Sequence, residues 1–458
     1  MTESIAYLDQ TKKEHHTLKE CNELRFESSS KAYVQQQLIY LKRTDFHNID
    51  FPKTLTSQNT NFNFFLCFYV FCCVKCITWI SLIFVVFIEV TEGACEIFGS
   101  ELQKNTKHNI GPGVKASIFT FTGAKVKITG SCEFQYVSKE TPMESYFKFA
   151  IGLEQMRIKA QRCYDDQQAK PFVPRVVVVG ASDTGKSTLC QYLLNFAVRC
   201  NRNPMFVDLD CGQNSVSVPG TIGTVMVERP SNPTTLEFEN KGALMLHYGH
   251  SSPSANYKLY EALVARMADV IEVKFSNDEK SGSSGCIINT CGWMGDTQMS
   301  YNSLINVVQK FEANVVVVMD SERLYNDVKK DVSALESNIR VVKLPKSPGV
   351  ISRTPETRLE SREMNFKKYF YGNIKINPLE KNEQLRYEFF PHTKVIEFSN
   401  LCMLKIGAPS LPESALPIGV EQVDFDLKVV PVTIDDNLKN RVCSVSYRIS
   451  IFIKCFLD

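Results

Sequence analysis

The sequence carries almost no net charge. Its 52 Lys and Arg residues are balanced by 50 Asp and Glu residues over 458 positions, which gives a formal net charge of +2. A chain with so little net charge has no overall field that would attract a polyanion, so any contact with nucleic acid must come from a local patch. Tryptophan is also scarce, with only Trp79 and Trp293.

The usual signs of export and of repetition are missing as well. The first 30 residues are polar and charged, so we expect no secretory signal peptide. The 16 cysteines are scattered from Cys21 to Cys455, without the density or spacing of a disulfide scaffold. We find no internal repeats. Reduced thiols in the cytosol or nucleus are therefore expected.

What is present begins with a β pattern. At 458 residues the chain is too long for one ordinary domain, and two or three are expected. Residues 117–129 alternate polar and apolar side chains about a turn at Gly123, which predicts a small β domain within residues 1–140. A capping box, Thr141 to Glu144 with Pro142 at the first helical position, then predicts a helix from 142 towards 163, followed by a linker at 165–174.

The hydrophobic pattern of the sequence changes after the linker. Continuous apolar runs alternate with helical stretches, and the runs lie at 175–179, 205–209, 286–289 and 315–319. Such runs suit strands that are buried on both faces, so residues 141–370 are predicted to form an α/β domain with a parallel sheet covered by helices. Short strands and prolines after residue 370 predict a third, β-rich domain over residues 371–458.

The strongest motif is a phosphate-binding loop between the first of these strands and its helix. The pattern Gly-x-x-x-x-Gly-Lys-Ser lets backbone N–H groups cradle phosphates, the lysine reaches the β- and γ-phosphates, and the serine holds magnesium. A strand leads directly into the loop and an amphipathic helix leads out, as the motif requires. We therefore expect these residues to bind nucleotide, with Ser187 on the metal: Gly180, Asp183, Thr184, Gly185, Lys186, Ser187 and Thr188.

The class of nucleotide enzyme depends on the second strand. The chain has no Asn-Lys-x-Asp tetrapeptide, which a GTPase would normally carry as its guanine reader. Instead, the run at 205–209 is followed by Asp210, at the sheet edge where such folds bind ligands. Asp210 could accept the proton of an attacking hydroxyl, as in a kinase, or it could cap a loop or order magnesium-bound water.

The segments 183–188 and 208–213 resemble those of the eukaryotic polyribonucleotide 5′-hydroxyl kinases of the pre-mRNA cleavage complex. The resemblance covers roughly residues 18–34 and 90–445. It implies an N-terminal β-sandwich, a central P-loop kinase domain and a C-terminal β-rich domain. Further similar blocks occur in the same order, at 23–26, 96–99, 137–142, 153–156, 288–293, 322–325, 344–347 and 407–409.

The resemblance also assigns residues that the pattern alone does not. It implies that Glu23 and Lys115 contact the nucleotide, although from the sequence both would pass for surface residues. Ser251 corresponds to a hydroxyl that helps to hold the RNA end.

Three further residues have competing interpretations. Trp293 corresponds to an aromatic that stacks on a base, while a core tryptophan is the alternative. Arg353 and Arg358 correspond to lid arginines over the γ-phosphate, while a solvated loop is the alternative.

Two functions follow. The first is an RNA 5′-kinase that uses ATP and Mg²⁺, with Lys186, Asp210, Arg353 and Arg358 as its catalytic residues. The second is a scaffold subunit of RNA 3′-end processing that holds ATP without turnover, as some fungal members of the family do. The residues present favour the active enzyme. For either role the resemblance implies RNA with a 5′-hydroxyl end, a cleavage factor II subunit and the tRNA-splicing endonuclease as partners, and a nuclear location.

Two regions depart from this family. About fifty residues are inserted at 35–88, and within them residues 64–88 contain one charge, Lys75. That length can span a bilayer, but a single helix would leave the two halves of the β-sandwich on opposite sides, so a membrane role is not expected.

Cys73 and Cys76 could form half of a zinc site, but no second pair follows at ligand spacing. The composition of the insertion resembles translated AT-rich non-coding sequence, such as a retained intron. The other departure is the tail after residue 446, where several strands of the C-terminal domain are predicted to be missing.

Overall fold

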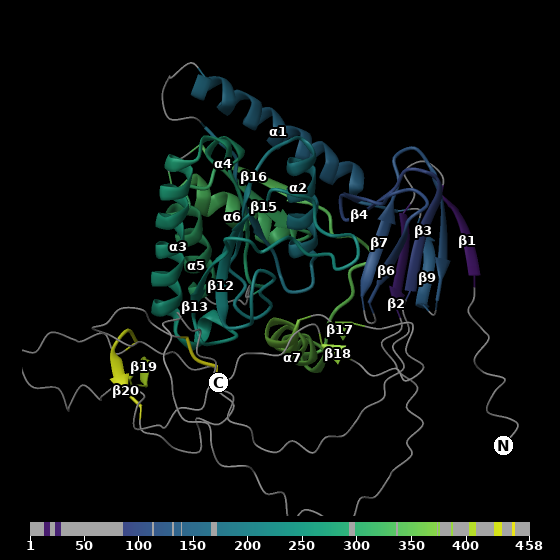
Figure 1. Ribbon diagram of the computed structural model, residues 1–458. Coiled ribbons are helices and arrows are strands. Elements are labelled where there is room, and N and C mark those ends of the chain that lie inside the picture. The colour runs from purple at the N-terminus through teal and green to yellow at the C-terminus, as the bar shows by residue number, and fades with distance from the viewer. Residues whose placement is uncertain are drawn as a thin grey trace, which may run out of the picture.

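The computed structural model describes most of the chain between residues 86 and 372. The described ranges there are 86–111, 114–130, 132–138, 140–165, 172–292, 298–335 and 338–372. Short segments are described at 13–18, 23–28, 374–375, 386–387, 403–408, 426–432 and 442–444. Figure 1 shows a sandwich of strands beside a larger layered domain, with α7 (Pro355–Tyr371) below the latter.

The N-terminal part is a β-sandwich. One sheet has the order β1 (Lys13–Leu18), β8 (Ala124–Thr129), β3 (Val86–Gly93) and β6 (Lys107–Ile110). The other has the order β5 (Ser100–Glu101), β4 (Glu96–Ile97), β7 (Lys115–Phe119), β2 (Glu23–Ser28) and β9 (Cys132–Ser138). The inward-facing side chains of the strands form one apolar cluster, which includes Ile88, Ile118 and Val126. The predicted sandwich is therefore confirmed.

The predicted boundary of the insertion is wrong at its C-terminal end. Residues 86–88 belong to β3, which pairs antiparallel with β6 so that Val86 lies opposite Ile110. The side chains of Val86 and Ile88 are fully buried in the sandwich core. The apolar run at 64–88 thus ends in a core strand of the domain. The remainder of the insertion, up to residue 85, lies outside the described residues.

This boundary gives a prediction about deletions. Removal of residues 36–84 is expected to leave a soluble, cooperatively folded chain, because β3 stays whole. Removal of residues 36–88 is expected to unfold the sandwich, since truncation of a buried Ile alone costs about 2–5 kcal/mol. Thermal unfolding followed by circular dichroism distinguishes the two. If the shorter deletion also unfolds, the insertion contributes to the fold and is not a foreign segment.

The central domain is built on a seven-stranded sheet. A helix precedes it, α1 (Met143–Asp165), and Thr141 Oγ1 caps that helix by accepting a hydrogen bond from the Met143 N–H at 3.3 Å. The strand order is β13 (Leu244–His247), β12 (Thr221–Met226), β11 (Met205–Asp208), β14 (Cys286–Asn289), β10 (Arg175–Val179), β15 (Val315–Met319) and β16 (Arg340–Leu344).

The strands from β11 to β16 in this order are parallel, as the apolar runs predicted. The strands β12 and β13 were not predicted from the sequence, and they run antiparallel at one edge of the sheet.

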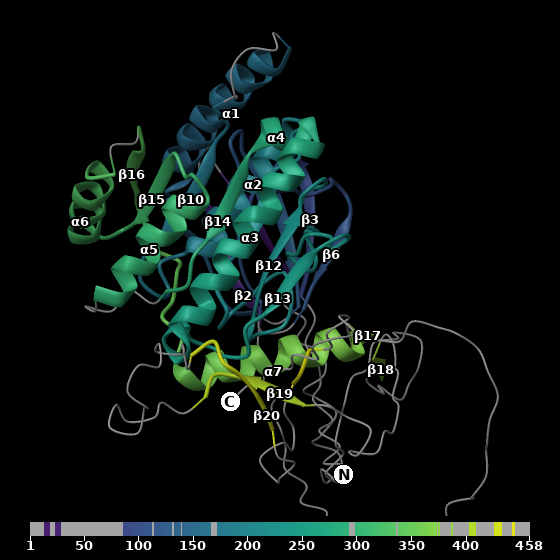
Figure 2. The same ribbon diagram turned by 90° about the vertical axis from the view of Figure 1, so that its left-hand side faces the viewer.

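Helices cover both faces of this sheet, as Figure 2 shows. Alternate residues of β10 point to opposite faces, with Val176 and Val178 in one apolar cluster and Val177 and Val179 in the other. The first cluster includes side chains of α1 and α2 (Lys186–Arg199). The second includes side chains of α3 (Tyr257–Asn277), α5 (Gln298–Lys310) and α6 (Glu322–Ser333). A short helix, α4 (Glu279–Ser284), follows α3.

The sandwich is fixed against the helix that follows the phosphate loop. Phe119 of β7 belongs to the same apolar cluster as α1 and α2. Asn195 Nδ2 of α2 donates to the Phe98 carbonyl at 2.8 Å, and Arg199 forms an ion pair with the buried Glu96 at 2.5 Å. These contacts hold the sandwich beside the loop, so its residues can line a site there.

The remaining described segments lie near the lower end of the central domain. The helix α7 has no buried residue. Two small sheets follow it, one from β17 (Ile374–Lys375) and β18 (Arg386–Tyr387) and one from β19 (Leu404–Ile406) and β20 (Val429–Pro431). They agree with a β-rich C-terminal part. Among the described residues no helix is both long and apolar enough to cross a bilayer.

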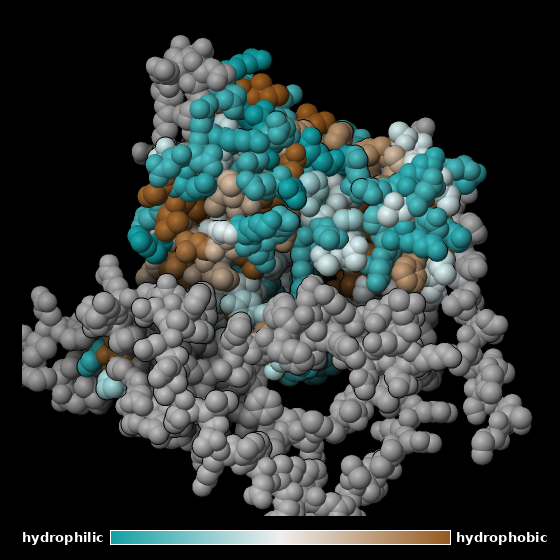
Figure 3. All heavy atoms as spheres, in the orientation of Figure 1, coloured by the Kyte–Doolittle hydropathy of each residue, from teal (hydrophilic) through white to brown (hydrophobic). Residues whose placement is uncertain are grey.

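The surface of the described domains is mostly polar. Figure 3 shows hydrophilic residues over much of α1, α2 and the sandwich, with hydrophobic residues in small separate groups. The exposed apolar side chains of the described residues include Phe147, Ile151 and Ile158 of α1. Scattered groups of this size are ordinary on a folded protein.

Candidate active site

The predicted phosphate loop lies between β10 and α2. Gly185 precedes the first turn of α2 with φ 89°, a conformation that L-residues with a side chain rarely adopt. At Gly180 a Cβ would lie 2.9 Å from Thr184 Oγ1 and 3.0 Å from Met319 Cβ, so the loop admits no side chain there. The chain therefore turns tightly at both glycines and directs the loop towards the N-terminus of α2, where anions are stabilised.

Lys186 lies across this loop. Its Nζ donates to the carbonyls of Gly180 and Ala181 at 2.9 and 2.8 Å, and its side chain is buried. Burial lowers the pKa of the Lys186 ammonium, and the nearby Asp210 carboxylate opposes that shift. An anionic phosphate in the loop would favour the charged ammonium in the same way.

Asp210 follows β11 and is half-buried. Its Oδ1 accepts hydrogen bonds from the N–H groups of Gly212 at 2.9 Å and Gln213 at 3.0 Å. Burial raises the pKa of the Asp210 carboxyl, although these hydrogen bonds and the charge of Lys186 pull it down. One carboxylate oxygen of Asp210 therefore caps the loop, as in the second interpretation of this residue. The other oxygen has no hydrogen-bond partner among the described residues.

A second carboxylate, Asp208, was not singled out from the sequence. It ends β11 and is fully buried, and Asn289 at the end of the neighbouring β14 donates through Nδ2 to Asp208 Oδ1 at 2.9 Å. The same Nδ2 lies 3.3 Å from Ser187 Oγ, so it joins Asp208 to the metal-binding serine of the motif. Ser215 donates twice to Asp208 Oδ2, from its N–H at 2.8 Å and its Oγ at 2.6 Å. The sequence signal that could have identified Asp208 is that two buried strands, now seen to be adjacent and parallel, both end in a polar residue.

The ionisation of Asp208 gives a testable pH dependence. Burial, and then the charge of Asp210, raises the pKa of Asp208 to about 6, against the hydrogen bonds from Ser215 and Asn289. A carboxyl whose folded-state pKa is raised stabilises the fold while it is protonated, and this contribution is lost as pH rises through about 6. Asp208→Asn cannot ionise. We expect its Tm, relative to wild type, to improve as pH rises from about 4 to about 6, the range between the ordinary pKa of 3.8 and the raised pKa, and to change little above that.

The control for this measurement is Ser333→Ala at the exposed end of α6, which removes no titratable group, so its Tm relative to wild type should not depend on pH. A wild-type protein that gains stability over Asp208→Asn as pH rises would show that the ionised form of Asp208 is the stabilising one, and would contradict the expectation.

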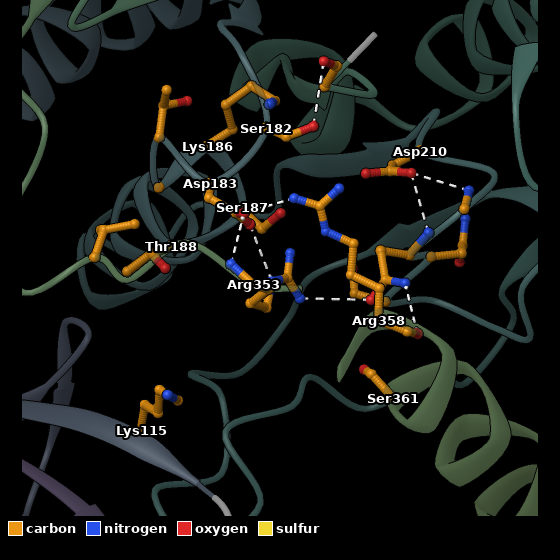
Figure 4. A pocket seen from close by; sticks show the side chains of 18 of the residues that line it. Lys115, Ser182, Asp183, Lys186, Ser187, Thr188, Asp210, Arg353, Arg358 and Ser361 are labelled. Atoms are coloured by element: carbon orange, nitrogen blue, oxygen red, sulfur yellow. Dashed lines mark hydrogen bonds and ion pairs between the residues drawn. The ribbon is translucent and has the colours of Figure 1, made fainter. Parts of the chain in front are cut away.

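The two arginines predicted for the lid reach the phosphate loop. Arg353 lies before α7 and Arg358 in its first turn, and both contact Asp183. Figure 4 shows their guanidinium groups directed at Asp183, with Lys115 across the cavity. Hydrogen bonds from both arginines lower the pKa of Asp183, although burial alone would raise it.

These groups line one large cleft of about 1170 Å³. The phosphate loop, Asp210 and the lid arginines lie on its central-domain side, and Lys115 of β7 lies on its sandwich side. Ser251 also lines the cleft, and its carbonyl lies 2.6 Å from where a Cβ on Gly212 would be. Among the remaining predicted residues, Glu23 is described only as a backbone position in β2, opposite Phe119, and Trp293 lies outside the described residues.

The oxygen atoms at the ends of β11 and β14 fit a magnesium ion. No cluster of three or more His, Cys, Asp or Glu side chains that could hold a metal occurs among the described residues. Mg²⁺ beside a nucleotide needs no such cage, since it keeps several waters and is held by phosphates and one or two protein oxygens. Ser187 Oγ and Asp208 supply such oxygens, and Asn289 Oδ1 beside them is buried without a hydrogen-bond partner.

Family models match the chain in three blocks. The model for the "mRNA cleavage and polyadenylation factor CLP1 P-loop" matches residues 180–372. The model for the "N-terminal beta-sandwich domain of polyadenylation factor" matches residues 84–160, and that for the "Pre-mRNA cleavage complex II protein Clp1" matches residues 389–450.

Curated relatives match over most of their length. The polyribonucleotide 5′-hydroxyl-kinase Clp1 of Xenopus tropicalis is 43% identical over 358 residues, which cover 78% of this chain and 76% of that protein. The human protein of the same name is 41% identical over 359 residues, with 78% and 79% covered. The CLP1 homologue of Nematostella vectensis is 42% identical over 354 residues, with 77% and 78% covered.

A solved structure shares the fold. The Clp1p chain in "Structure of wild-type Clp1p-Pcf11p (454 -563) complex" superposes with a TM-score of 0.67, covering 95% of this chain and 86% of that chain. The identity is 18%, so this likeness concerns the fold alone.

Proposed function

Since the chain belongs to the Clp1 family, we propose that it is an ATP-dependent polyribonucleotide 5′-hydroxyl kinase that works as a subunit of the pre-mRNA 3′-end cleavage machinery. One observation carries the proposal. A single cleft brings together a phosphate loop, a carboxylate at the adjacent strand end and two arginines from the segment at the start of α7. Phosphoryl transfer needs these groups and little covalent chemistry from the protein.

The reaction assigns a role to each group. The loop amides and Lys186 hold the β- and γ-phosphates of ATP, and Asp210 accepts the proton of the RNA 5′-hydroxyl. The 5′ oxygen then forms a bond to the γ-phosphorus, the bond from that phosphorus to the β–γ bridging oxygen breaks, and ADP leaves. Arg353 and Arg358 stabilise the charge on the transferred phosphoryl group.

The other predicted residues bind rather than react. Magnesium, held through Ser187 and its neighbours, would neutralise the charge on the β- and γ-phosphate oxygens. Thr184 and Thr188 complete the loop, and Glu23 and Lys115 contact the nucleotide from the sandwich. Ser251 and Trp293 hold the RNA end, the latter by stacking on a base.

Partners and location follow from the same family. The solved relative is in complex with Pcf11p, which supports a cleavage factor II subunit as a partner of this chain. The tRNA-splicing endonuclease is a further proposed partner, and a nuclear location follows from pre-mRNA cleavage.

The experiment that tests the proposal is single-turnover incubation of the purified protein with ATP, Mg²⁺ and a 5′-hydroxyl RNA oligonucleotide. We expect ADP and 5′-phosphorylated RNA in equal amounts. ATP that stays bound and intact in the presence of RNA would instead support the silent scaffold.

A further inference from the structure

One carboxylate occupies the point at which the lid meets the phosphate loop. Asp183 Oδ2 accepts a hydrogen bond from the backbone N–H of Arg353 at 2.9 Å and from Nη2 of Arg358 at 2.6 Å. Its Oδ1 accepts one from Arg353 Nε at 3.0 Å. Both oxygens are used, and the side chain is only 7% exposed. Two ion pairs with a buried carboxylate of this kind are stronger than exposed surface pairs.

The helix α7, which carries Arg358 and begins two residues after Arg353, packs loosely on the central domain. None of the residues of α7 is buried, so no apolar core fixes its position. Polar contacts also join α7 to the central domain: Gln213 Nε2 donates to the Arg358 carbonyl at 3.3 Å, and Lys368 forms an ion pair with Glu237. The first of these is long. Asp183 therefore supplies the strongest contacts at the N-terminal end of α7, through Arg358 of the helix and Arg353 just before it.

The charges at this point do not balance. One carboxylate faces two guanidinium groups, which leaves an excess positive charge beside the phosphate loop. Each arginine has five N–H donors, and Asp183 engages only one side-chain N–H of each. The arginines can thus remain on Asp183 and still donate to an anion.

We propose that Asp183 is a positioning residue, whose carboxylate anchors the lid and holds Arg353 and Arg358 at the phosphate loop. Its side chain acts through the arginines, because both oxygens are engaged by them, and residue 183 contributes to nucleotide binding only through the backbone of the phosphate loop. This role rests on the proposed kinase function and refines it: Asp183 fixes the arginines in advance, so that no reorganisation is needed when charge develops on the phosphoryl group.

The kinetic test uses two substitutions that the backbone tolerates. Asp183 has φ 57°, a left-handed conformation that Asn and Gly adopt readily, so Asp183→Asn and Asp183→Gly should both fold. We expect kcat to fall about 10- to 100-fold in both, because misplacement by about 1 Å has costs of that size. The KM for ATP should change less than about threefold, since Lys186 and the loop amides remain. Asp327→Asn, which loosens an Arg–Asp pair on the surface of α6, is the matched control.

A double-mutant cycle separates positioning from general damage. If Asp183 acts through the arginines, Asp183→Asn should cost less than about twofold in a chain that already carries Arg353→Gln and Arg358→Gln. A full, additive loss in that background would overturn the proposal.

A structural measurement tests the anchor without any catalysis. Hydrogen exchange of the ATP-free protein should become faster in the segment 350–358 for Asp183→Asn, and stay unchanged in α2 and for Asp327→Asn. Unchanged exchange at 350–358 would show that Asp183 does not hold the lid. Were the wild-type protein to transfer no phosphate to any polynucleotide, the proposed function would fail, and the exchange result alone would decide the anchor.

Discussion

Asp210→Asn is expected to lower the kcat for phosphoryl transfer to RNA by about 10²- to 10⁴-fold, the contribution of a positioned general base. The Kd for ATP should stay within about threefold of wild type, because the phosphate loop is intact. The substitution is nearly isosteric. An amide oxygen at residue 210 can still accept the N–H groups of Gly212 and Gln213, which the carboxylate now holds at 2.9 and 3.0 Å. The local loop should therefore keep its shape.

The raised pKa of Asp210 strengthens this expectation. Burial moves the pKa upward from its ordinary value of 3.8, which makes the carboxylate a better proton acceptor near neutral pH. Isothermal titration with ATP and rapid-quench kinetics on the same preparation measure the two quantities. Near-normal turnover in Asp210→Asn would contradict the assignment and direct attention to Asp208, the other carboxylate at this strand end.

Replacement of both lid arginines, Arg353→Gln with Arg358→Gln, is expected to reduce kcat by about 10³-fold or more. Arginines that stabilise the transferred phosphoryl group contribute about 10³- to 10⁵-fold in related enzymes. Both side chains line the cleft and lie at the phosphate loop, so the loss should appear in kcat rather than in the affinity for RNA. Steady-state kinetics with saturating RNA measures it.

A matched control comes from an arginine outside the cleft. Arg229 is 75% exposed and pairs loosely with Glu239 at 3.9 Å, so Arg229→Gln should leave kcat unchanged. A loss below about tenfold in the double variant would return Arg353 and Arg358 to the alternative of a solvated loop.

The features that could be predicted from the sequence are those that a local pattern of residues determines. Strand, glycine loop and amphipathic helix are contiguous around Lys186, so the phosphate site and the parallel strands beside it were visible without coordinates. The edge strands β12 and β13 were not, because they follow Asp210 through an irregular segment and pair antiparallel, an arrangement that no periodicity specifies.

Contacts between segments far apart in the sequence could not be predicted from local patterns. Asp183 and Arg353 are 170 positions apart, and Asp208 and Asn289 are 81 positions apart. Each pair forms because strand ends and a lid helix converge on one edge of the sheet. The boundary of the insertion failed for a related reason. Its apolar composition continues without a break into Val86 and Ile88, and only the pairing of β3 with β6 separates them.

Transfer of the labelled γ-phosphate of ATP to paired RNA oligonucleotides tests the central claim most directly. The two oligonucleotides share one sequence and differ only at the 5′ end, which carries a free hydroxyl in one and a phosphate in the other. The account predicts label on the 5′-hydroxyl RNA alone, removable by a phosphatase and absent with Lys186→Ala. Label on neither RNA from a folded protein that binds ATP, or equal label on both, would contradict it.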